Sequence, residues 1–341
     1  MFKKISYNLI FVAFNFCLFI FCLELFSRIL FPETAPKKNL YFNNMQNNLI
    51  IGPKNLTLRQ MKNSSDYNVE VSFNNYGFRD IKNLKNSKYS DFFVVGDSMS
   101  FGWGVEAKNR YSNILENLTN KNFYNISIPG NLENYELLIE HAEKNGAKIE
   151  NLIFGFTMEN DFQIYKKKKI NINPKINQSK NNFIFFNVPK LKRFLTQNSS
   201  FYFIITRTIQ RNEMLRNMFI KLKLINPNLD YIYYTKFSNK VINSTVNKLK
   251  NISKDYNSII LVIPSRALWY GDHMDEADQI HKTFINKLKN DKFDYLDLRE
   301  VLEKNNNPLK NLYLFNDGHW NNKGNEIVAK EIFNEYFKNK Y

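Results

Sequence analysis

Five residues of this 341-residue sequence carry the groups that acyl transfer requires. Ser98 supplies a hydroxyl nucleophile, which needs a base because a serine hydroxyl is a weak nucleophile at neutral pH. His319 carries an imidazole, the side chain that most often serves as such a base, and Asp317 is able to fix its tautomer and stabilise its protonated form. The backbone amides of Ser98 and Gly130 and the side chain of Asn160 are donors for the developing oxyanion, each typically worth about 3 kcal/mol. We therefore predict a catalytic triad of Ser98, His319 and Asp317, and an oxyanion hole of Ser98, Gly130 and Asn160.

Each of these residues also has an ordinary structural interpretation. A serine after a strand often caps the next helix, an asparagine forms turns and a glycine allows a tight bend. A histidine also occurs at the entry to a helix. We favour the catalytic interpretation because the serine, glycine and asparagine follow predicted strands and the histidine precedes the last predicted helix.

Alternating apolar and amphipathic segments position these residues. Apolar runs predict five strands, over 91–96, 123–128, 151–157, 259–263 and 293–298. Helical spacing of apolar positions predicts helices over 108–119, 132–145, 239–253, 273–289 and 322–337. This alternation predicts an α/β fold, a three-layer doubly wound sheet of five parallel strands with helices on both faces. Because ligands bind at the carboxyl ends of such strands, the candidate residues are expected to gather on one edge.

The N-terminus has the composition of a membrane anchor. A short basic segment, residues 1–8, precedes an apolar segment, residues 9–31, of about the length needed to cross a hydrocarbon core. A cleaved signal peptide is the alternative, but no small-residue cleavage site follows before Pro32. We therefore predict an uncleaved single-pass transmembrane helix. Lysines flank this segment on both sides, so their charges do not settle its orientation.

The rest of the chain divides into two parts. Residues 32–85 are polar and rich in asparagine, and we interpret them as a linker and N-terminal extension with one strand over 69–73. Residues 86–341 form the predicted catalytic domain. Within it, residues 162–237 break the alternation, include one predicted helix near 200–222 and are interpreted as an insertion over the catalytic edge.

Charge and cysteine content restrict the function further. The formal net charge of +16 would suit a nucleic-acid partner, but the basic residues are mostly scattered lysines, so we expect no nucleic acid. The one dense run, Lys166–Lys169, is interpreted as a solvated loop, with contact to anionic lipid or glycan as the alternative. Both cysteines, Cys17 and Cys22, lie in the apolar N-terminal segment. The remaining sequence therefore offers neither a disulfide nor a thiolate metal site.

The motifs at the strand ends resemble those of the SGNH hydrolases, also called the GDSL esterase/lipase family. Gly96-Asp97-Ser98 resembles the first block of that family and Gly130 the second. Asn160-Asp161 resembles the third block, and Asp317-Gly318-His319 resembles the last.

The sequence departs from the family pattern at two places. Met99 stands where the common motif Gly-Asp-Ser-Leu has leucine, and Asp317 lies two residues before His319, where the family often has a spacing of three. The shorter spacing resembles branches that acetylate polysaccharides. Two further segments, 75–80 and 102–105, are similar to a bacterial membrane-anchored branch.

This resemblance covers about 70–160 and 255–341, and it implies a flavodoxin-like SGNH hydrolase fold. It implies an esterase or acyltransferase with no metal and no organic cofactor. It also implies a location in the bacterial inner membrane, held there by the N-terminal helix, with the catalytic domain facing the periplasm or exterior. We expect a serine esterase whose substrate is an acyl ester, namely an O-acyl group such as acetyl on an envelope glycan. The alternatives are an O-acetyltransferase with the same triad and a non-catalytic glycan-binding protein on the same scaffold.

Two other classes of protein fit the sequence less well. An α/β-hydrolase elbow requires Gly-x-Ser-x-Gly, which is not present at Ser98. Residues 102–107 match the Gly-x-Gly-x-x-Ala fingerprint of dinucleotide-binding proteins. These glycines begin six residues after the strand end at Gly96, which is too late, and no acidic residue ends the second strand.

Overall fold

The chain forms two compact units. The first, the sheet unit, comprises Leu40–Met61, Asp66–Asn171 and Asn228–Tyr341. The second, the N-terminal unit, comprises Met1–Asn39, Lys62–Ser65 and Ile172–Pro227. The computed structural model describes residues 2–34, 40–62, 66–163, 191, 194–195, 198–222, 224, 236–315 and 317–338.

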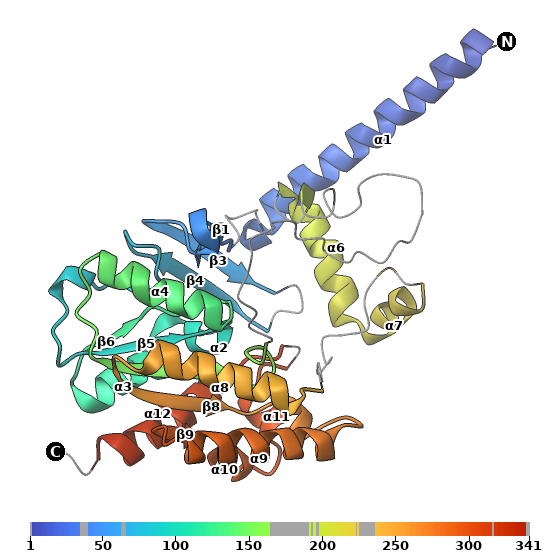
Figure 1. Cartoon of the computed structure of the whole chain (residues 1–341). Coiled ribbons are helices and arrows are strands. Elements are labelled where there is room, and N and C mark those ends of the chain that lie inside the picture. The colour runs from blue at the N-terminus through green and yellow to red at the C-terminus, as the bar shows by residue number, and fades with distance from the viewer. Residues whose placement is uncertain are drawn as a thin grey trace. The chain divides into compact units, whose positions relative to one another are not determined.

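A five-stranded parallel sheet forms the centre of the sheet unit (Figure 1). Its strands are β5 (Phe92–Gly96), β6 (Phe123–Asn125), β7 (Asn151–Thr157), β8 (Asn257–Ile263) and β9 (Tyr295–Asp297). Their spatial order is β6-β5-β7-β8-β9, which is the flavodoxin-like order of a doubly wound sheet. The predicted fold class is confirmed.

Helices cover both faces of this sheet. One face packs against α4 (Leu132–Lys144), α8 (Asn239–Ser253) and α9 (Met274–Asn290). The opposite face packs against α3 (Tyr111–Thr119), α10 (Arg299–Glu303), α11 (Pro308–Leu312) and α12 (Asn322–Tyr336). A short helix, α2 (Ser98–Phe101), follows β5 directly. The predicted helix over 239–253 has the bounds of α8, and the other predicted helices differ from the observed ones by a few residues at their ends.

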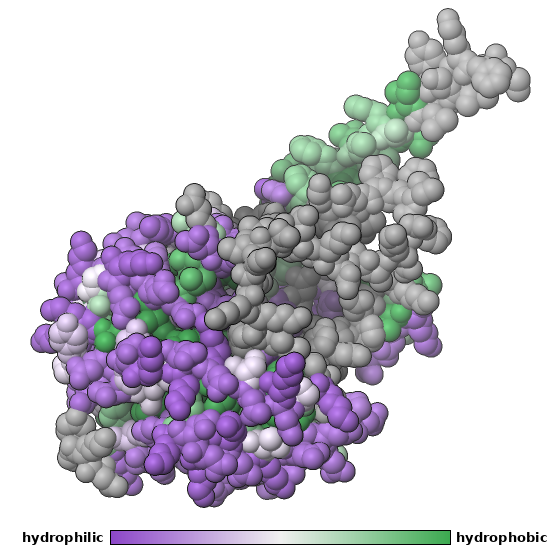
Figure 2. All heavy atoms as spheres, in the orientation of Figure 1, coloured by the Kyte–Doolittle hydropathy of each residue, from purple (hydrophilic) through white to green (hydrophobic). Residues whose placement is uncertain are grey.

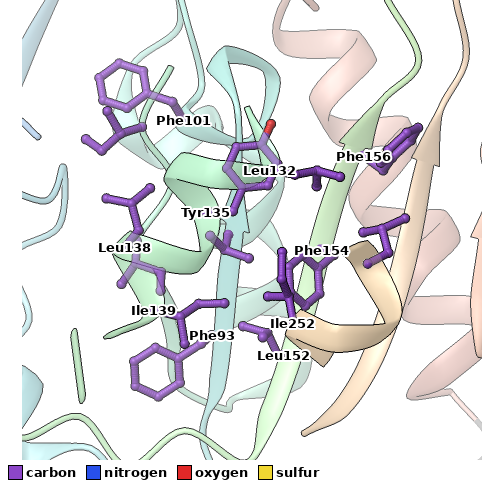
Figure 3. Packing of buried hydrophobic residues seen from close by; sticks show 14 of the residues in the cluster. Phe93, Phe101, Leu132, Tyr135, Leu138, Ile139, Leu152, Phe154, Phe156 and Ile252 are labelled. Atoms are coloured by element: carbon purple, nitrogen blue, oxygen red, sulfur yellow. The ribbon is translucent and has the colours of Figure 1, made fainter. Parts of the chain in front are cut away.

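The apolar strands are explained by burial on both faces. In β5, Phe93 and Val95 belong to the core beneath α4, whereas Val94 belongs to the core on the opposite face. Successive strand residues point to opposite sides, so a strand covered on both sides requires apolar residues without interruption. Figure 3 shows the first of these cores, in which Tyr135 of α4 and Phe154 of β7 take part.

Much of the segment interpreted as a linker and extension over 32–85 instead packs into the sheet unit. It contains a hairpin of β3 (Leu56–Met61) and β4 (Asn68–Phe73), and a smaller pair of β1 (Asn43–Asn44) and β2 (Ile50–Ile51). Leu58, Val71 and Phe73 are buried in the same core as α4. The compact unit therefore begins at Leu40, before the expected boundary at residue 86. Polar residues alternate with these apolar ones, so the segment has the composition of a linker although one side of it is buried.

The predicted insertion over 162–237 is largely assigned to the N-terminal unit, which takes residues 172–227. The single helix expected near 200–222 is two helices, α6 (Ser200–Arg211) and α7 (Glu213–Lys221). Asn212 separates them, because its side chain accepts a hydrogen bond from Leu215 N (3.0 Å) and caps the second helix. The run Lys166–Lys169 lies outside the described residues.

The N-terminal unit begins with a long apolar helix, α1 (Phe2–Leu30). Within it, Ile10–Leu30 is long and apolar enough to cross a membrane. Its apolar side chains are largely exposed, including Phe11 at 69% and Phe14 at 64%, and Figure 2 shows them along the helix. These properties fit a membrane anchor or a signal sequence.

An acidic residue near the end of α1 holds the start of α6. The Glu24 carboxylate accepts hydrogen bonds from Ser199 Oγ (2.7 Å), Ser200 N (2.9 Å) and Phe201 N (3.1 Å). The first backbone N–H groups of a helix have no partner within the helix, and its dipole favours negative charge there. Glu24 therefore serves as an N-terminal cap that is supplied by another helix.

Replacing Glu24 with alanine is expected to loosen the first turn of α6, because Ser200 N and Phe201 N lose their acceptor. A lost cap costs roughly 1 kcal/mol, so hydrogen exchange of these amides is expected to accelerate by about fivefold. Mass spectrometry of the full chain in detergent measures this rate, with the amides of α8 as an internal reference. Unchanged exchange at Ser200 and Phe201 would show that Ser199 caps α6 without Glu24.

Candidate active site

A glycine turn leads from β5 to Ser98 at the start of α2. Asp97 caps this helix, since its carboxylate accepts a hydrogen bond from Met99 N at 2.8 Å. A side chain at Gly96 would place its Cβ 2.4 Å from Ser100 Oγ, so only glycine allows the helix to follow the strand this closely. The turn holds Ser98, half-buried, at the carboxyl edge of the sheet.

The three predicted triad residues form one hydrogen-bonded chain. Ser98 Oγ lies 2.7 Å from His319 Nε2, although the two residues are 221 positions apart. On the other side of the imidazole ring, Nδ1 contacts Asp317 Oδ1. When Nδ1 carries the proton and donates it to the carboxylate, Nε2 is free to accept the hydrogen bond of the Ser98 hydroxyl. The arrangement has the connectivity that nucleophilic activation of a serine requires.

A tight turn between α11 and α12 carries both Asp317 and His319. Leu314 N donates to the carbonyl oxygen of His319 (2.9 Å), and Asp317 N donates to the carbonyl oxygen of Leu314 (3.1 Å). Tyr313 and Trp320 close the turn by an antiparallel bridge. This turn brings the Asp317 carboxylate to the ring of His319 at a spacing of two residues.

The predicted oxyanion donors lie at the same edge of the sheet. Asn160 follows β7, and its Nδ2 donates to Asp97 Oδ2 at 2.8 Å, beside Ser98 in the sequence. Gly130 lies two residues beyond Ile128, whose N–H donates to the carbonyl oxygen at the end of β5 (3.2 Å). Each of the three donor residues therefore follows one of three neighbouring strands, β5, β6 and β7.

A buried carboxyl group supports the turn that carries Asn160. Asp161 is fully buried, and it accepts hydrogen bonds from Thr157 N (2.8 Å) and from Tyr135 Oη (3.0 Å). Burial, followed by the negative charge of Asp97, raises the pKa of Asp161 well above its ordinary value. Burial also raises the pKa of Asp97, against the hydrogen bonds that it accepts.

Asp161→Asn is expected to remove the part of the pH dependence of the free energy of unfolding that comes from the Asp161 carboxyl group. The pKa of this carboxyl group is higher in the folded chain than in the unfolded chain, where it is about 3.9. Stability is therefore greatest below the unfolded pKa and is lost as the pH rises toward the folded pKa. Urea unfolding of the full chain in detergent is expected to show the wild type losing stability more steeply above about pH 4 than Asp161→Asn does. Parallel curves for the two proteins would contradict this account.

An ion pair joins the two turns that border the site. Arg266 donates from Nε to Glu159 Oε1 (3.1 Å) and from Nη2 to Glu159 Oε2 (2.9 Å). The same guanidinium packs on Gly318, where an added Cβ would lie 2.4 Å from Nη1. The pair thus ties the residue before Asn160 to the turn of Asp317 and His319. Neither Arg266 nor Glu159 belongs to a recognisable motif, so the sequence alone does not point to them.

Two aromatic residues outside the predicted set also contact Asp317 and His319. Tyr67 Oη lies 3.3 Å from Asp317 Oδ2, and the ring of Trp103 stacks on that of His319. Trp103 belongs to the segment 102–105, which resembles a bacterial membrane-anchored branch. For Tyr67 the sequence carries no signal, since it contacts a residue 250 positions away.

The described residues contain no group of three or more His, Cys, Asp or Glu side chains placed to hold a metal ion. The expectation that the enzyme uses no metal and no organic cofactor stays a prediction.

Comparison with known proteins finds one matching family model. Residues 236–340 match a family model described as "SGNH hydrolase-like domain, acetyltransferase AlgX". None of the curated proteins matches the chain. A lipolytic protein of the G-D-S-L family from Veillonella parvula DSM 2008 has 12% identity and a TM-score of 0.41, covering 73% of this chain and 98% of its own. A putative lipolytic protein of the same family from Desulfitobacterium hafniense DCB-2 has 11% identity and a TM-score of 0.38, covering 71% and 96%. Both structural similarities are too weak to add to the argument.

The matched region contains Asp317 and His319, and the five-stranded parallel sheet has the strand order expected from the resemblance. This domain type supports acyl-group hydrolysis or transfer in general. Residues 236–340 are thus similar to an SGNH hydrolase-like domain, and this similarity supports an SGNH hydrolase family member.

Proposed function

We propose that this chain is a serine acyl-ester hydrolase. In this proposal Ser98 is the nucleophile, His319 is the general base and Asp317 orients and stabilises the imidazole ring. The observation that carries the proposal is the hydrogen-bonded chain from Ser98 Oγ through both nitrogens of His319 to Asp317.

The reaction proceeds in two halves. Ser98 Oγ attacks the ester carbonyl carbon while Nε2 of His319 takes the hydroxyl proton. The tetrahedral intermediate collapses, the bond to the leaving alcohol breaks, and His319 returns the proton to that alcohol. The acyl group now esterifies Ser98. A water molecule, deprotonated by the same histidine, attacks this ester and releases the carboxylic acid and free Ser98.

Three donors are assigned to the oxyanion of the tetrahedral intermediate. They are the backbone amides of Ser98 and Gly130 and the side-chain amide of Asn160. One hydrogen of Asn160 Nδ2 already binds Asp97 Oδ2, which leaves the second for the substrate. The hydrogen bond to Asp97 thereby sets the direction of the remaining donor.

We propose O-acetyl groups of an envelope glycan as the substrate. The description of the matching family model names an acetyltransferase, which supports acetyl as the acyl group. The apolar helix Ile10–Leu30 supports a single-pass anchor in the bacterial inner membrane, with the sheet unit in the periplasm or exterior, where such glycans occur. We propose no nucleic-acid partner.

Acetyl transfer is a second candidate, favoured by that same family description. The first half of the reaction is unchanged. A sugar hydroxyl then takes the place of water, gives its proton to His319 and leaves with the acetyl group. Hydrolysis and transfer therefore differ only in which hydroxyl reaches the acyl-enzyme on Ser98.

The test uses the full chain in detergent with p-nitrophenyl acetate, with and without an unacetylated oligosaccharide. Hydrolysis releases equal amounts of acetate and p-nitrophenol whether or not the oligosaccharide is present. If the chain is a transferase, adding the oligosaccharide accelerates p-nitrophenol release. Mass spectrometry then detects the acetylated sugar. Ser98→Ala is expected to abolish either activity. If the chain binds an acetylated oligosaccharide but shows no turnover that depends on Ser98, this result would contradict catalysis and support a glycan-binding protein.

A further inference from the structure

A buried tyrosine contacts the carboxylate of the triad from the side opposite the histidine. Tyr67 precedes β4 and is 9% exposed. Its hydroxyl donates to Asp317 Oδ2 at 3.3 Å, while Asp317 Oδ1 contacts His319 Nδ1. Burial, and next the charge of Asp317, raise the pKa of Tyr67, so the phenol keeps its proton and acts as the donor. The two oxygens of one carboxylate thus have different partners.

A tryptophan links this tyrosine to the histidine ring. Trp103 Nε1 donates to Tyr67 Oη at 2.8 Å. Its indole ring stacks on the imidazole of His319, with ring centroids 5.5 Å apart and an interplanar angle of 28°. Because the phenol oxygen accepts a hydrogen bond from Trp103, its own hydrogen is directed to Asp317. Tyr67, Trp103, Asp317 and His319 therefore form a closed ring of contacts.

The backbone around Trp103 is fixed by a buried arginine. Arg79 is 2% exposed, and its guanidinium donates to the carbonyl oxygens of Gly102 (2.6 Å) and Val105 (2.7 Å). It also donates to the carbonyl oxygen of Glu70 in β4 (3.2 Å), the strand that follows Tyr67. The loop of Trp103 and the hairpin of Tyr67 are thus tied to each other.

We propose that Tyr67 is a positioning residue for Asp317, and that Trp103 positions both Tyr67 and the ring of His319. This inference rests on the proposed function of the triad. The Tyr67 hydroxyl holds the carboxylate with Oδ1 toward Nδ1 and shares its negative charge. Without the Tyr67 hydroxyl, the Asp317 carboxylate stabilises the His319 imidazolium more strongly. A higher pH is then needed to deprotonate His319.

Tyr67→Phe tests this role in the full chain in detergent. Because the carboxylate is then no longer held with Oδ1 toward Nδ1, we expect kcat for p-nitrophenyl acetate to fall by about tenfold with little change in KM, which is the lower end of losses seen for supporting residues. We also expect the acidic limb of the kcat/KM profile to move to higher pH. Trp103→Phe keeps an aromatic ring but loses the donor, and a smaller change in the same direction is expected.

The matched control is Tyr76→Phe. Tyr76 is also buried, and its hydroxyl donates to Asn83 rather than to the site (2.6 Å). This variant loses a buried tyrosine hydroxyl in the same part of the chain, so its kcat and pH profile are expected to equal those of the wild type. Equal losses in Tyr67→Phe and Tyr76→Phe would show a general loss of packing and overturn the proposal.

A second readout does not depend on turnover. The proton between His319 Nδ1 and Asp317 gives a far-downfield proton NMR signal, identified by its absence in Asp317→Asn. We expect Tyr67→Phe to move this signal and Tyr76→Phe to leave it unchanged. If the signal moves in Tyr67→Phe but turnover does not depend on Ser98, the positioning role is kept and the proposed function is overturned. An unmoved signal together with an unchanged pH profile in Tyr67→Phe would overturn the positioning role.

Discussion

Replacing Ser98 with alanine is expected to lower kcat for p-nitrophenyl acetate by about 10⁵-fold, since removal of a triad nucleophile eliminates the covalent route. The folded chain is expected to survive the change, because Ser98 is half-buried and its hydroxyl contacts only His319 among the described residues. Initial rates of the purified full chain in detergent measure the loss. The unfolding midpoint, recorded for the same samples, separates lost catalysis from lost structure.

Ser72→Ala is the matched serine control. Ser72 is an exposed residue of β4 whose hydroxyl pairs with that of Thr57 at 2.8 Å. Its replacement is expected to leave kcat unchanged. If Ser98→Ala kept more than a small fraction of the wild-type rate with an unaltered unfolding midpoint, Ser98 would not be the nucleophile.

Asp317→Asn is expected to have the second largest effect, a loss of about 10⁴-fold in kcat. The asparagine amide is able to donate to His319 Nδ1, and this favours the tautomer that carries its proton on Nε2. In that tautomer Nε2 has no lone pair for the Ser98 hydroxyl, so the base is lost although the geometry remains. Steady-state kinetics of the full chain measures this loss, with KM expected to stay near the wild-type value.

A second aspartate–histidine pair in the sheet unit provides the control for this variant. His281 Nε2 lies 2.8 Å from Asp297 Oδ2. The other nitrogen, His281 Nδ1, has no hydrogen-bond partner among the residues that the structure describes. Asp297→Asn perturbs this pair, which contacts no serine nucleophile, and is expected to leave kcat within a few-fold of wild type. Similar losses in Asp317→Asn and Asp297→Asn would contradict the specific role of Asp317.

The sheet was predictable because its strands are buried on both faces. The apolar run that ends at Gly96 and the run over 259–263 contain few polar residues, and such runs mark central parallel strands. The hairpin of β3 and β4 was harder to predict from the sequence, because only one of its sides is buried. In β4 the exposed residues alternate with Val69, Val71 and Phe73, and only this strand was anticipated. Its partner β3 contains Gln60, a buried polar residue that interrupts the pattern.

The sequence points to candidate site residues where these follow strand ends and carry groups that can take part in a reaction. Ser98 and His319 stand out because a hydroxyl and an imidazole, together with Asp317, supply the groups that acyl transfer requires. Tyr67 and Trp103 act through side chains that are common in cores, and nothing in their local sequence distinguishes them from packing residues. Their contacts with Asp317 and His319 join segments that are far apart in the chain, so these contacts are seen only in the structure.

The break between α6 and α7 has a local cause that periodicity does not detect. The apolar residues of both helices continue at helical spacing across the boundary, which favours one helix. Asn212 competes with that continuation, since its side chain accepts from Leu215 N and its backbone adopts an extended conformation. A single capping residue therefore outweighs the apolar pattern.

The most direct measurement is covalent labelling of the full chain with a fluorophosphonate, followed by peptide mapping. The account predicts one label per chain, located on Ser98, formed at a rate that falls strongly in His319→Ala and lost in Ser98→Ala. A label on another residue, or p-nitrophenyl acetate turnover that continues after Ser98 is fully labelled, would contradict the assignment of Ser98 as the nucleophile.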